Sequence, residues 1–153
     1  MTDETEDRYA RARASAMRAM ASIREMVARM EHADDCDGED CDLEPADLGG
    51  MDSDEYHDSE SARLSIEESA LSVEVRGGWH SPGDESEDEE FMILLATGGP
   101  ALRIVGELGR WLAHWQPRLE MQDWWIPWQE VALDYEDYAA LRSYCECFRW
   151  DLP

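Results

Sequence analysis

The sequence predicts an α+β protein: a four-stranded antiparallel meander sheet with a long N-terminal helix and a C-terminal helix. Helical periodicity fills the first thirty residues, short runs of alternating apolar residues follow between 71 and 121, and helical periodicity returns after Asp134. An acidic linker separates the first helix from the sheet. We therefore expect an N-terminal helix at 1–33, a partly helical or mobile acidic linker at 34–63, and an α+β core domain at 64–153.

The first helix is expected from about Asp3 to Met30. Thr2 or Asp3 can cap it, and the acids of its first turn suit the helix dipole. One face carries a narrow stripe of small residues and methionine: Tyr9, Ala12, Ala16, Ala19, Ile23, Met26 and Met30. Such a stripe packs against a single surface. We expect that surface to be the body of the chain, and a second copy in a homodimer is the alternative.

The segment 31–62 differs from the rest in composition. It contains fourteen acids and neither lysine nor arginine, and Gly38, Pro45, Gly49 and Gly50 interrupt any long helix. High charge with few apolar residues is typical of a mobile linker. A short helix is expected near Ser53 to Arg63.

Four strands are expected next. Leu71, Val73 and Val75 alternate with polar residues in the first, and Phe91, Ile93 and Leu95 mark the second. Residues 97–100 supply a tight turn. Leu102, Ile104 and Val105 begin the third strand, and Leu119 and Met121 mark the fourth. Asp134 caps a final helix that reaches to about Phe148.

Charge limits the partners. The 153 residues include 37 acids and 13 basic residues, all of them arginine, so the formal net charge is -24. This charge repels nucleic acid and anionic membranes and attracts basic surfaces. No apolar run approaches the roughly 18 residues that span a bilayer, and the acidic N-terminus does not look like a signal peptide. We therefore expect a soluble protein of the cytoplasm with reduced cysteines.

Chemistry-bearing motifs are few. No P-loop, GxGxxG, GxSxG or HExxH pattern occurs, so we expect neither an enzyme nor a cofactor. A calcium loop centred on Gly38 fails at its first position, which is Ala33. Cys36, Cys41, Cys145 and Cys147, with His32 and His57 nearby, allow a zinc site in principle. Their spacings are not the usual CxxC pairs, so reduced thiols without metal are preferred.

Two features point to a binding protein. The first is carboxylate density in two clusters, and the second is a tryptophan-rich segment, since tryptophan is enriched at binding hot spots. Most tryptophans are expected in the core, but neighbours alternate on a strand, so at least one is exposed or covered by the first helix. The candidate partner-binding residues are Asp34, Asp35, Asp37, Glu39, Asp40, Asp42, Asp84, Glu85, Glu87, Asp88, Glu89, Glu90, Trp111, Trp115 and Trp125.

Three blocks carry a family resemblance: LSVEVRGGWHSPG at 71–83, FMILLATGGPALRIVGEL at 91–108 and RLEMQDWWIPW at 118–128. In this order they resemble a family of small acidic proteins encoded by bacteriophages and prophages, over about residues 64–150. The resemblance implies a phage context, similar in kind to anti-CRISPR and anti-restriction inhibitors, some of which mimic DNA. It carries over no catalytic residue.

The first hypothesis is therefore a phage-encoded inhibitor of a bacterial defence system, with anti-CRISPR as the first choice. It would act in the host cytoplasm by binding a basic nucleic-acid-binding surface of a protein complex through DNA-like acidic contacts. The second hypothesis is a non-catalytic phage structural or regulatory interaction module, which could form a homodimer. A divalent-metal-binding protein is the third.

Overall fold

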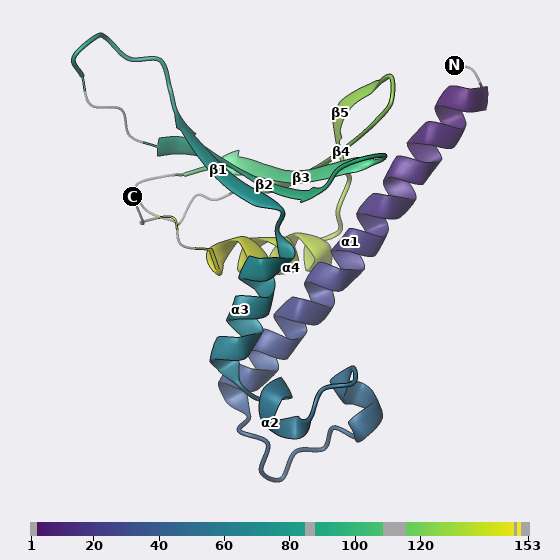
Figure 1. Ribbon diagram of the computed structural model, residues 1–153, viewed down its shortest axis with the longest axis vertical. Coiled ribbons are helices and arrows are strands. Elements are labelled where there is room, and N and C mark those ends of the chain that lie inside the picture. The colour runs from purple at the N-terminus through teal and green to yellow at the C-terminus, as the bar shows by residue number, and fades with distance from the viewer. Residues whose placement is uncertain (1–2, 85–87, 109–115, 149, 151–153) are drawn as a thin grey trace.

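The computed structural model describes residues 3–84, 88–108, 116–148 and 150, and it has an α+β fold (Figure 1). The helices are α1 (Asp3–Asp35), the 3-10 helix η1 (Pro45–Leu48), α2 (Ser53–Tyr56), α3 (Ser59–Ser69) and α4 (Tyr135–Glu146). The strands are β1 (Ser72–Gly77), β2 (Asp88–Ala96), β3 (Ala101–Glu107), β4 (Arg118–Asp123) and β5 (Ile126–Glu130). None of the helices in the described ranges is long and apolar enough to cross a membrane.

The sheet is an antiparallel meander in the order β1-β2-β3-β4-β5. The meander and its two flanking helices are confirmed, but the expectation of four strands is wrong because β5 returns along β4. The turn between them consists of Trp124 and Trp125, and Asp123 lies opposite Ile126. Two-residue hairpin turns usually contain glycine or asparagine, and this turn contains neither, so the sequence carries no turn signal here.

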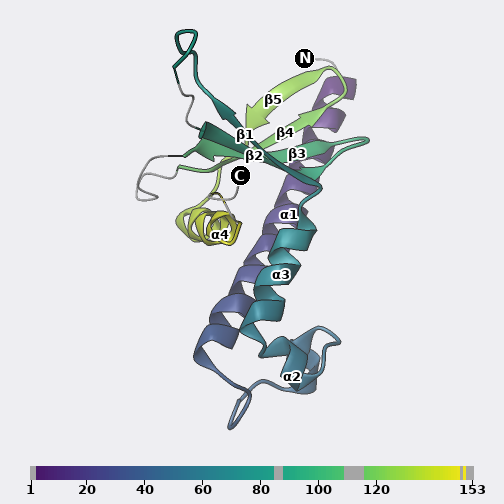
Figure 2. The same cartoon turned by 60° about the vertical axis from the view of Figure 1, so that its left-hand side comes forward.

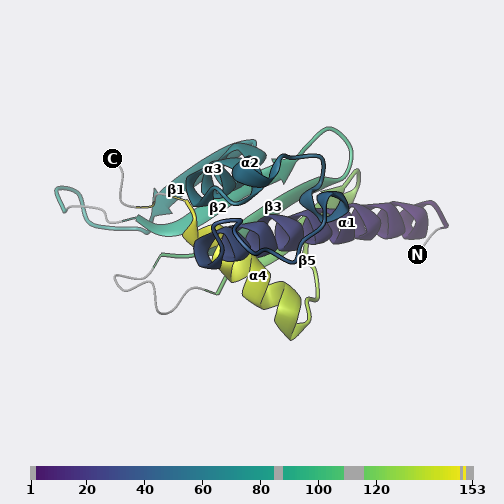
Figure 3. The same ribbon diagram turned by 90° about the horizontal axis from the view of Figure 1, so that it is seen from below.

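The core lies between one face of the sheet and the helices. Ile93 lies opposite Ile104, which in turn lies opposite Leu119, and all three are fully buried. Since side chains alternate along a strand, these residues point to the same face. Seen from below, α1, α3 and α4 lie in front of the sheet (Figure 3). Buried Ile66 and Leu141 bring α3 and α4 into the same core.

Helix α1 buries its apolar stripe inside the chain. Ala12, Ala16 and Ile23 are at most 2% exposed, and the helix contacts α3, α4 and the sheet. The expectation of intramolecular packing is confirmed for most of the stripe, whereas Tyr9 is 38% exposed. At the other end of the chain, Asp134 caps α4 as expected, because its carboxylate accepts the N–H of Asp137 at 2.8 Å.

Residues 31–62, called the acidic lobe below, surround the far end of α1 (Figure 2). The helix runs to Asp35, further than expected, and the chain then passes through η1 and α2 before entering α3. Two helices, α2 and the start of α3, thus occupy the stretch where one short helix was predicted. Asp52 and Asp58 cap them by accepting the N–H groups of Glu55 and Ser61.

Candidate functional site

The acidic lobe displays all of its carboxylates to solvent. Each of the following side chains is exposed: Glu31, Asp34, Asp35, Asp37, Glu39, Asp40, Asp42, Glu44, Asp47, Asp52, Asp54, Glu55, Asp58 and Glu60. Of the two flanking arginines, Arg29 is buried and Arg63 pairs with Asp34 at 2.8 Å. Asp34 also accepts a short hydrogen bond from Ser59. Asp34 therefore has a local role, whereas Asp35, Glu39, Asp40 and Asp42 make no ion pair within the described part of the chain.

The second acidic cluster, at residues 84–90, does not form a single group in the described residues. Asp84 is exposed, whereas Asp88, Glu89 and Glu90 belong to β2. Glu90 is exposed and pairs with Arg76 of β1. The predicted contacts at Glu85 and Glu87 lie outside the described residues. The acids placed here are far fewer than those of the lobe.

The described tryptophans are more exposed than expected. Trp125 is 90% exposed, in keeping with the expectation that at least one tryptophan faces solvent, but Trp124 (68%) and Trp79 are exposed as well, although most tryptophans were expected in the core. Trp124 and Trp125 do not alternate on a strand because they form the β4–β5 turn. The predicted contacts at Trp111 and Trp115 lie outside the described residues. The described core is aliphatic and methionine-rich, with Tyr144, Phe91 and Phe148 as its buried aromatic residues.

Two arginines of helix α1 contact the β4–β5 turn and hold it in place. Arg8 donates to the carbonyl oxygen of Trp124 at 3.1 Å. Arg11 Nε lies 3.3 Å from the buried carboxylate of Asp123, an ion pair without hydrogen-bond alignment, and the other Asp123 oxygen accepts the Trp124 N–H at 2.8 Å. Trp125 has φ 69°, a left-handed conformation that a side chain disfavours. The exposed indoles of Trp124 and Trp125 are thus held on a fixed, strained turn. These two residues are called the tryptophan tip below.

A second cluster lies inside the acidic lobe. One donor atom from each of His32, Cys36, Cys41 and His57 lies within 4.8 Å of all the others. Helix α1 provides His32, and Cys36 directly follows the helix and donates its N–H to the His32 carbonyl at 2.8 Å. The two residues therefore share a helix face. Gly38, at φ 95°, turns the chain back toward Cys41, and His57 follows α2.

Hydrogen bonds set the electrostatics of this cluster. The N–H of Leu43 lowers the pKa of the Cys41 thiol, and His57 lowers that pKa further. The pKa of His57 is raised, first by its hydrogen bond to the Ser53 carbonyl and then by Cys41. Both shifts favour a thiolate beside a protonated imidazole ring. The sequence analysis considered these residues for zinc but preferred metal-free thiols, although the pair Cys36-x4-Cys41 falls within the spacing range of structural zinc sites.

The other two cysteines are elsewhere and behave differently. Burial raises the pKa of Cys145 well above its ordinary value, and it also raises that of Cys147. Cys147 Sγ contacts Met30 at 3.1 Å. The four-thiolate combination considered from the sequence is therefore not assembled, and Cys145 and Cys147 are thiols of the core and its margin.

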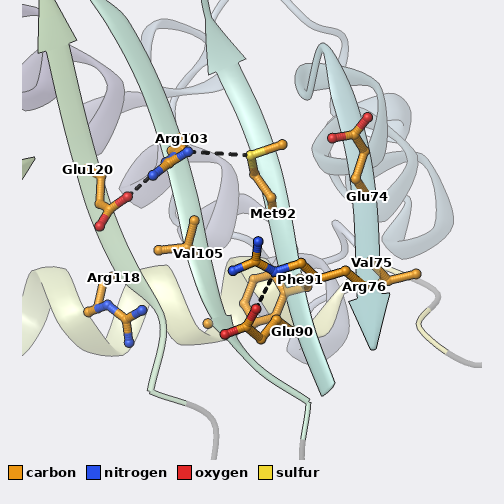
Figure 4. Close-up of a pocket in the computed structure, with 11 residues that line it drawn as sticks. Glu74, Val75, Arg76, Glu90, Phe91, Met92, Arg103, Val105, Arg118 and Glu120 are labelled. Carbon is orange, nitrogen blue, oxygen red and sulfur yellow. Dashed lines mark hydrogen bonds and ion pairs between the residues drawn. The ribbon is translucent and has the colours of Figure 1, made fainter. Parts of the chain in front are cut away.

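The open face of the sheet carries a groove of about 670 Å³ (Figure 4). Three glutamates and three arginines line it: Glu74, Glu90, Glu120, Arg76, Arg103 and Arg118. Arg103 donates to Glu120 at 2.7 Å and stacks over Trp128 at 4.0 Å. Because acids and arginines are equal in number, this groove has no net charge with which to select a charged ligand.

Comparisons with protein-family models, with curated proteins and with solved structures find no match to this chain.

Proposed function

We propose that this chain is a non-catalytic inhibitor that binds a basic, nucleic-acid-binding surface of a protein complex through its acidic lobe. The observation that carries this proposal is the exposure of all fourteen lobe carboxylates. With no lysine or arginine in 31–62, the lobe has a formal charge of −14, more than half of the chain's −24. Of the two nearest arginines, Arg63 offsets the charge of Asp34 and Arg29 is buried, so most of the negative charge of the lobe remains at the surface.

Density matters as much as total charge. Double-stranded DNA presents one negative charge per roughly 1.7 Å of its axis. Carboxylates crowded on a small folded lobe suit a protein channel that normally holds phosphates, and such attraction speeds association and favours the correct partner. The resemblance to small acidic phage proteins supplies the biological context, and a CRISPR effector complex is the first partner to test.

The tryptophan tip supports a second contact. Exposed tryptophan that is already fixed in place loses little conformational entropy on binding, and its face attracts arginine and lysine. The exposed acids Asp3, Glu4, Glu6 and Asp7 share its end of the molecule. The tip and the lobe lie at opposite ends of α1 (Figure 1), whose 33 residues extend for about 50 Å. A partner that touches both is therefore large.

The test compares two charge variants of the full chain. The first carries Asp35→Asn, Glu39→Gln, Asp40→Asn and Asp42→Asn, and the matched control, away from both the lobe and the tryptophan tip, carries Glu25→Gln, Glu68→Gln, Glu107→Gln and Glu130→Gln. Both remove four exposed charges. Binding to purified CRISPR effector complexes is measured at two salt concentrations, with double-stranded DNA as competitor.

We expect the lobe variant to bind at least tenfold more weakly than the control, and we expect DNA to compete with the unmodified chain. Equal affinities of the two variants would remove the lobe from the interface. Binding that DNA leaves unchanged would contradict a shared basic surface.

A further inference from the structure

We propose that His32, Cys36, Cys41 and His57 bind one Zn²⁺ ion in a closed structural site at the centre of the acidic lobe. The two Nε2 atoms of His32 and His57 lie 3.0 Å apart. Cys41 Sγ lies 3.5 Å from His32 Nε2 and 3.3 Å from His57 Nε2. The fourth donor, Cys36, lies within the same 4.8 Å limit.

The three separations among His32, Cys41 and His57 are close to the edges of a zinc tetrahedron. With Zn–N bonds of about 2.0–2.1 Å and Zn–S bonds of about 2.3 Å, neighbouring ligand atoms lie roughly 3.3 to 3.8 Å apart. The observed contacts are shorter by at most a few tenths of an ångström, so small side-chain rotations admit the ion. Without an ion, the two imidazole nitrogens and the sulfur have few protons available to form hydrogen bonds with one another, and a bound cation would satisfy all three lone pairs.

The surrounding groups orient the donors. The Nδ1–H of His57 donates to the Ser53 carbonyl at 2.7 Å, so the neutral ring presents the lone pair of Nε2 to the cluster. Such outer contacts fix the tautomer of metal-binding histidines. Leu43 N–H donates to Cys41 Sγ at 3.5 Å. A Cβ at Gly38 would meet the His57 ring at 3.3 Å, so glycine permits both the turn and the approach.

The donor set selects the metal. Two sulfurs and two imidazoles suit Zn²⁺, whereas Ca²⁺ and Mg²⁺ require oxygen ligands. Four protein ligands fill the coordination shell, which is typical of a structural zinc site and leaves no position for a substrate. A hollow of about 410 Å³, lined by Ala33, Asp34, Asp35, Cys36, Asp37, Glu39 and His57, gives the ion a path from solvent.

The lobe also needs such a centre. Within 31–62 the buried side chains are Ala33, Leu48, His57 and Ala62, which is little apolar surface for a segment with fourteen acids. Small folds with so small a core commonly depend on a metal. Zinc bound by two thiolates would hold α1, the turn at Gly38 and α2 together, against the repulsion of the carboxylates.

The experiment uses the untagged full chain. Its metal content is measured after purification from zinc-supplemented medium, and the metal-free chain is titrated with Co²⁺. We expect one zinc per chain and the visible absorption of tetrahedral Co²⁺ with two thiolate ligands, which added Zn²⁺ abolishes and excess Ca²⁺ leaves intact. Cys36→Ser and Cys41→Ser should each lower Zn²⁺ affinity at least a hundredfold, whereas Cys147→Ser should retain it.

The reactivity of the thiols gives an answer even where a variant folds poorly. In the native chain, Zn²⁺ should protect Cys36 and Cys41 from alkylation and leave the reactivity of Cys147 unchanged. The proposal is overturned by a chain that takes up no stoichiometric metal, or by a metal that survives removal of both Cys36 and Cys41. An octahedral Co²⁺ spectrum would overturn it as well, since that spectrum would place the ion among the carboxylates. None of these outcomes depends on the proposed partner.

Discussion

The buried guanidinium of Arg29 donates to the carbonyl oxygen of Glu55 at 2.8 Å, and none of its described contacts is with a carboxylate. Arg29 also reaches the Tyr56 carbonyl and the hydroxyls of Ser61 and Ser65. Its charge therefore lies at the C-terminal end of α2, where the helix dipole is negative. This one side chain joins α1 to both α2 and α3.

Arg29→Met should destabilise the chain by about 3 kcal/mol, because it leaves buried carbonyl and hydroxyl groups without their charged donor. The measurement is the free energy of unfolding in urea. Arg24→Met is the control on the same helix. Arg24 is partly exposed and pairs with Glu136 and Asp137, so its loss should cost under about 1 kcal/mol. Equal losses in the two variants would contradict the role given to Arg29.

Local signals in the sequence predicted most elements of the fold. The cap at Asp134, the acidic first turn of α1 and the alternation around Ile93 and Ile104 depend on neighbours within a few residues. Strand β5 was missed because the turn at Trp124 and Trp125 has none of the usual turn residues. Its left-handed backbone is held by contacts with α1, which are more than a hundred residues away in sequence.

Sequence spacing did not favour the candidate metal centre, for a similar reason. His32 and Cys36 form a helical pair only because α1 continues past Met30, and His57 joins them through the fold of the lobe. Spacing alone gave no reason to separate these four residues from Cys145 and Cys147. The acids of the lobe could be identified from composition, but their full exposure depends on the fold.

Trp125→Gly should leave the chain as stable as before or stabilise it by up to about 1 kcal/mol, while it weakens partner binding. Glycine accepts φ 69° without the strain of a side chain, which offsets its greater freedom in the unfolded chain. Thermal unfolding and binding to the effector complex are measured on the same preparation. A marked loss of stability would show that the indole contributes to the fold.

Trp124→Ala separates the effect of backbone strain on stability from the effect of an exposed indole on binding. Trp124 is also exposed, but its φ is not in the left-handed region. We expect this variant to weaken binding without any gain in stability. If both variants bind the partner like the unmodified chain, the tryptophan tip is not part of the interface.

Gly106→Ala should cost about 1–3 kcal/mol, because the new methyl group meets a packed ring. A Cβ at this position would lie 2.5 Å from Phe91 Cε1 and 3.4 Å from the Pro117 backbone. Gly99→Ala is the matched control, since no atom lies within 4 Å of its Cβ and its φ is not positive. Melting temperatures should fall for the first variant and stay close to the native value for the second; the reverse order would contradict the packing of β3 described here.

The stability of the chain should fall as pH rises from about 10 to 12, because burial raises the pKa of Tyr144 to about 12 from an unfolded value near 10. The folded chain favours the neutral phenol, which shares a 2.6 Å hydrogen bond with Ser69. This contribution is therefore complete below pH 10 and is lost as the pH passes the folded pKa.

Urea unfolding of the native chain and of Tyr144→Phe measures this contribution between pH 8 and pH 11. Arginine keeps its charge throughout this pH range. Tyr144→Phe should be less stable at pH 8, by about 1 kcal/mol for the lost hydrogen bond, but should lose less stability as the pH rises. The raised pKa of Cys145 acts in the same direction in both proteins, so the difference between their slopes isolates Tyr144, and equal slopes would assign the whole pH dependence to other groups.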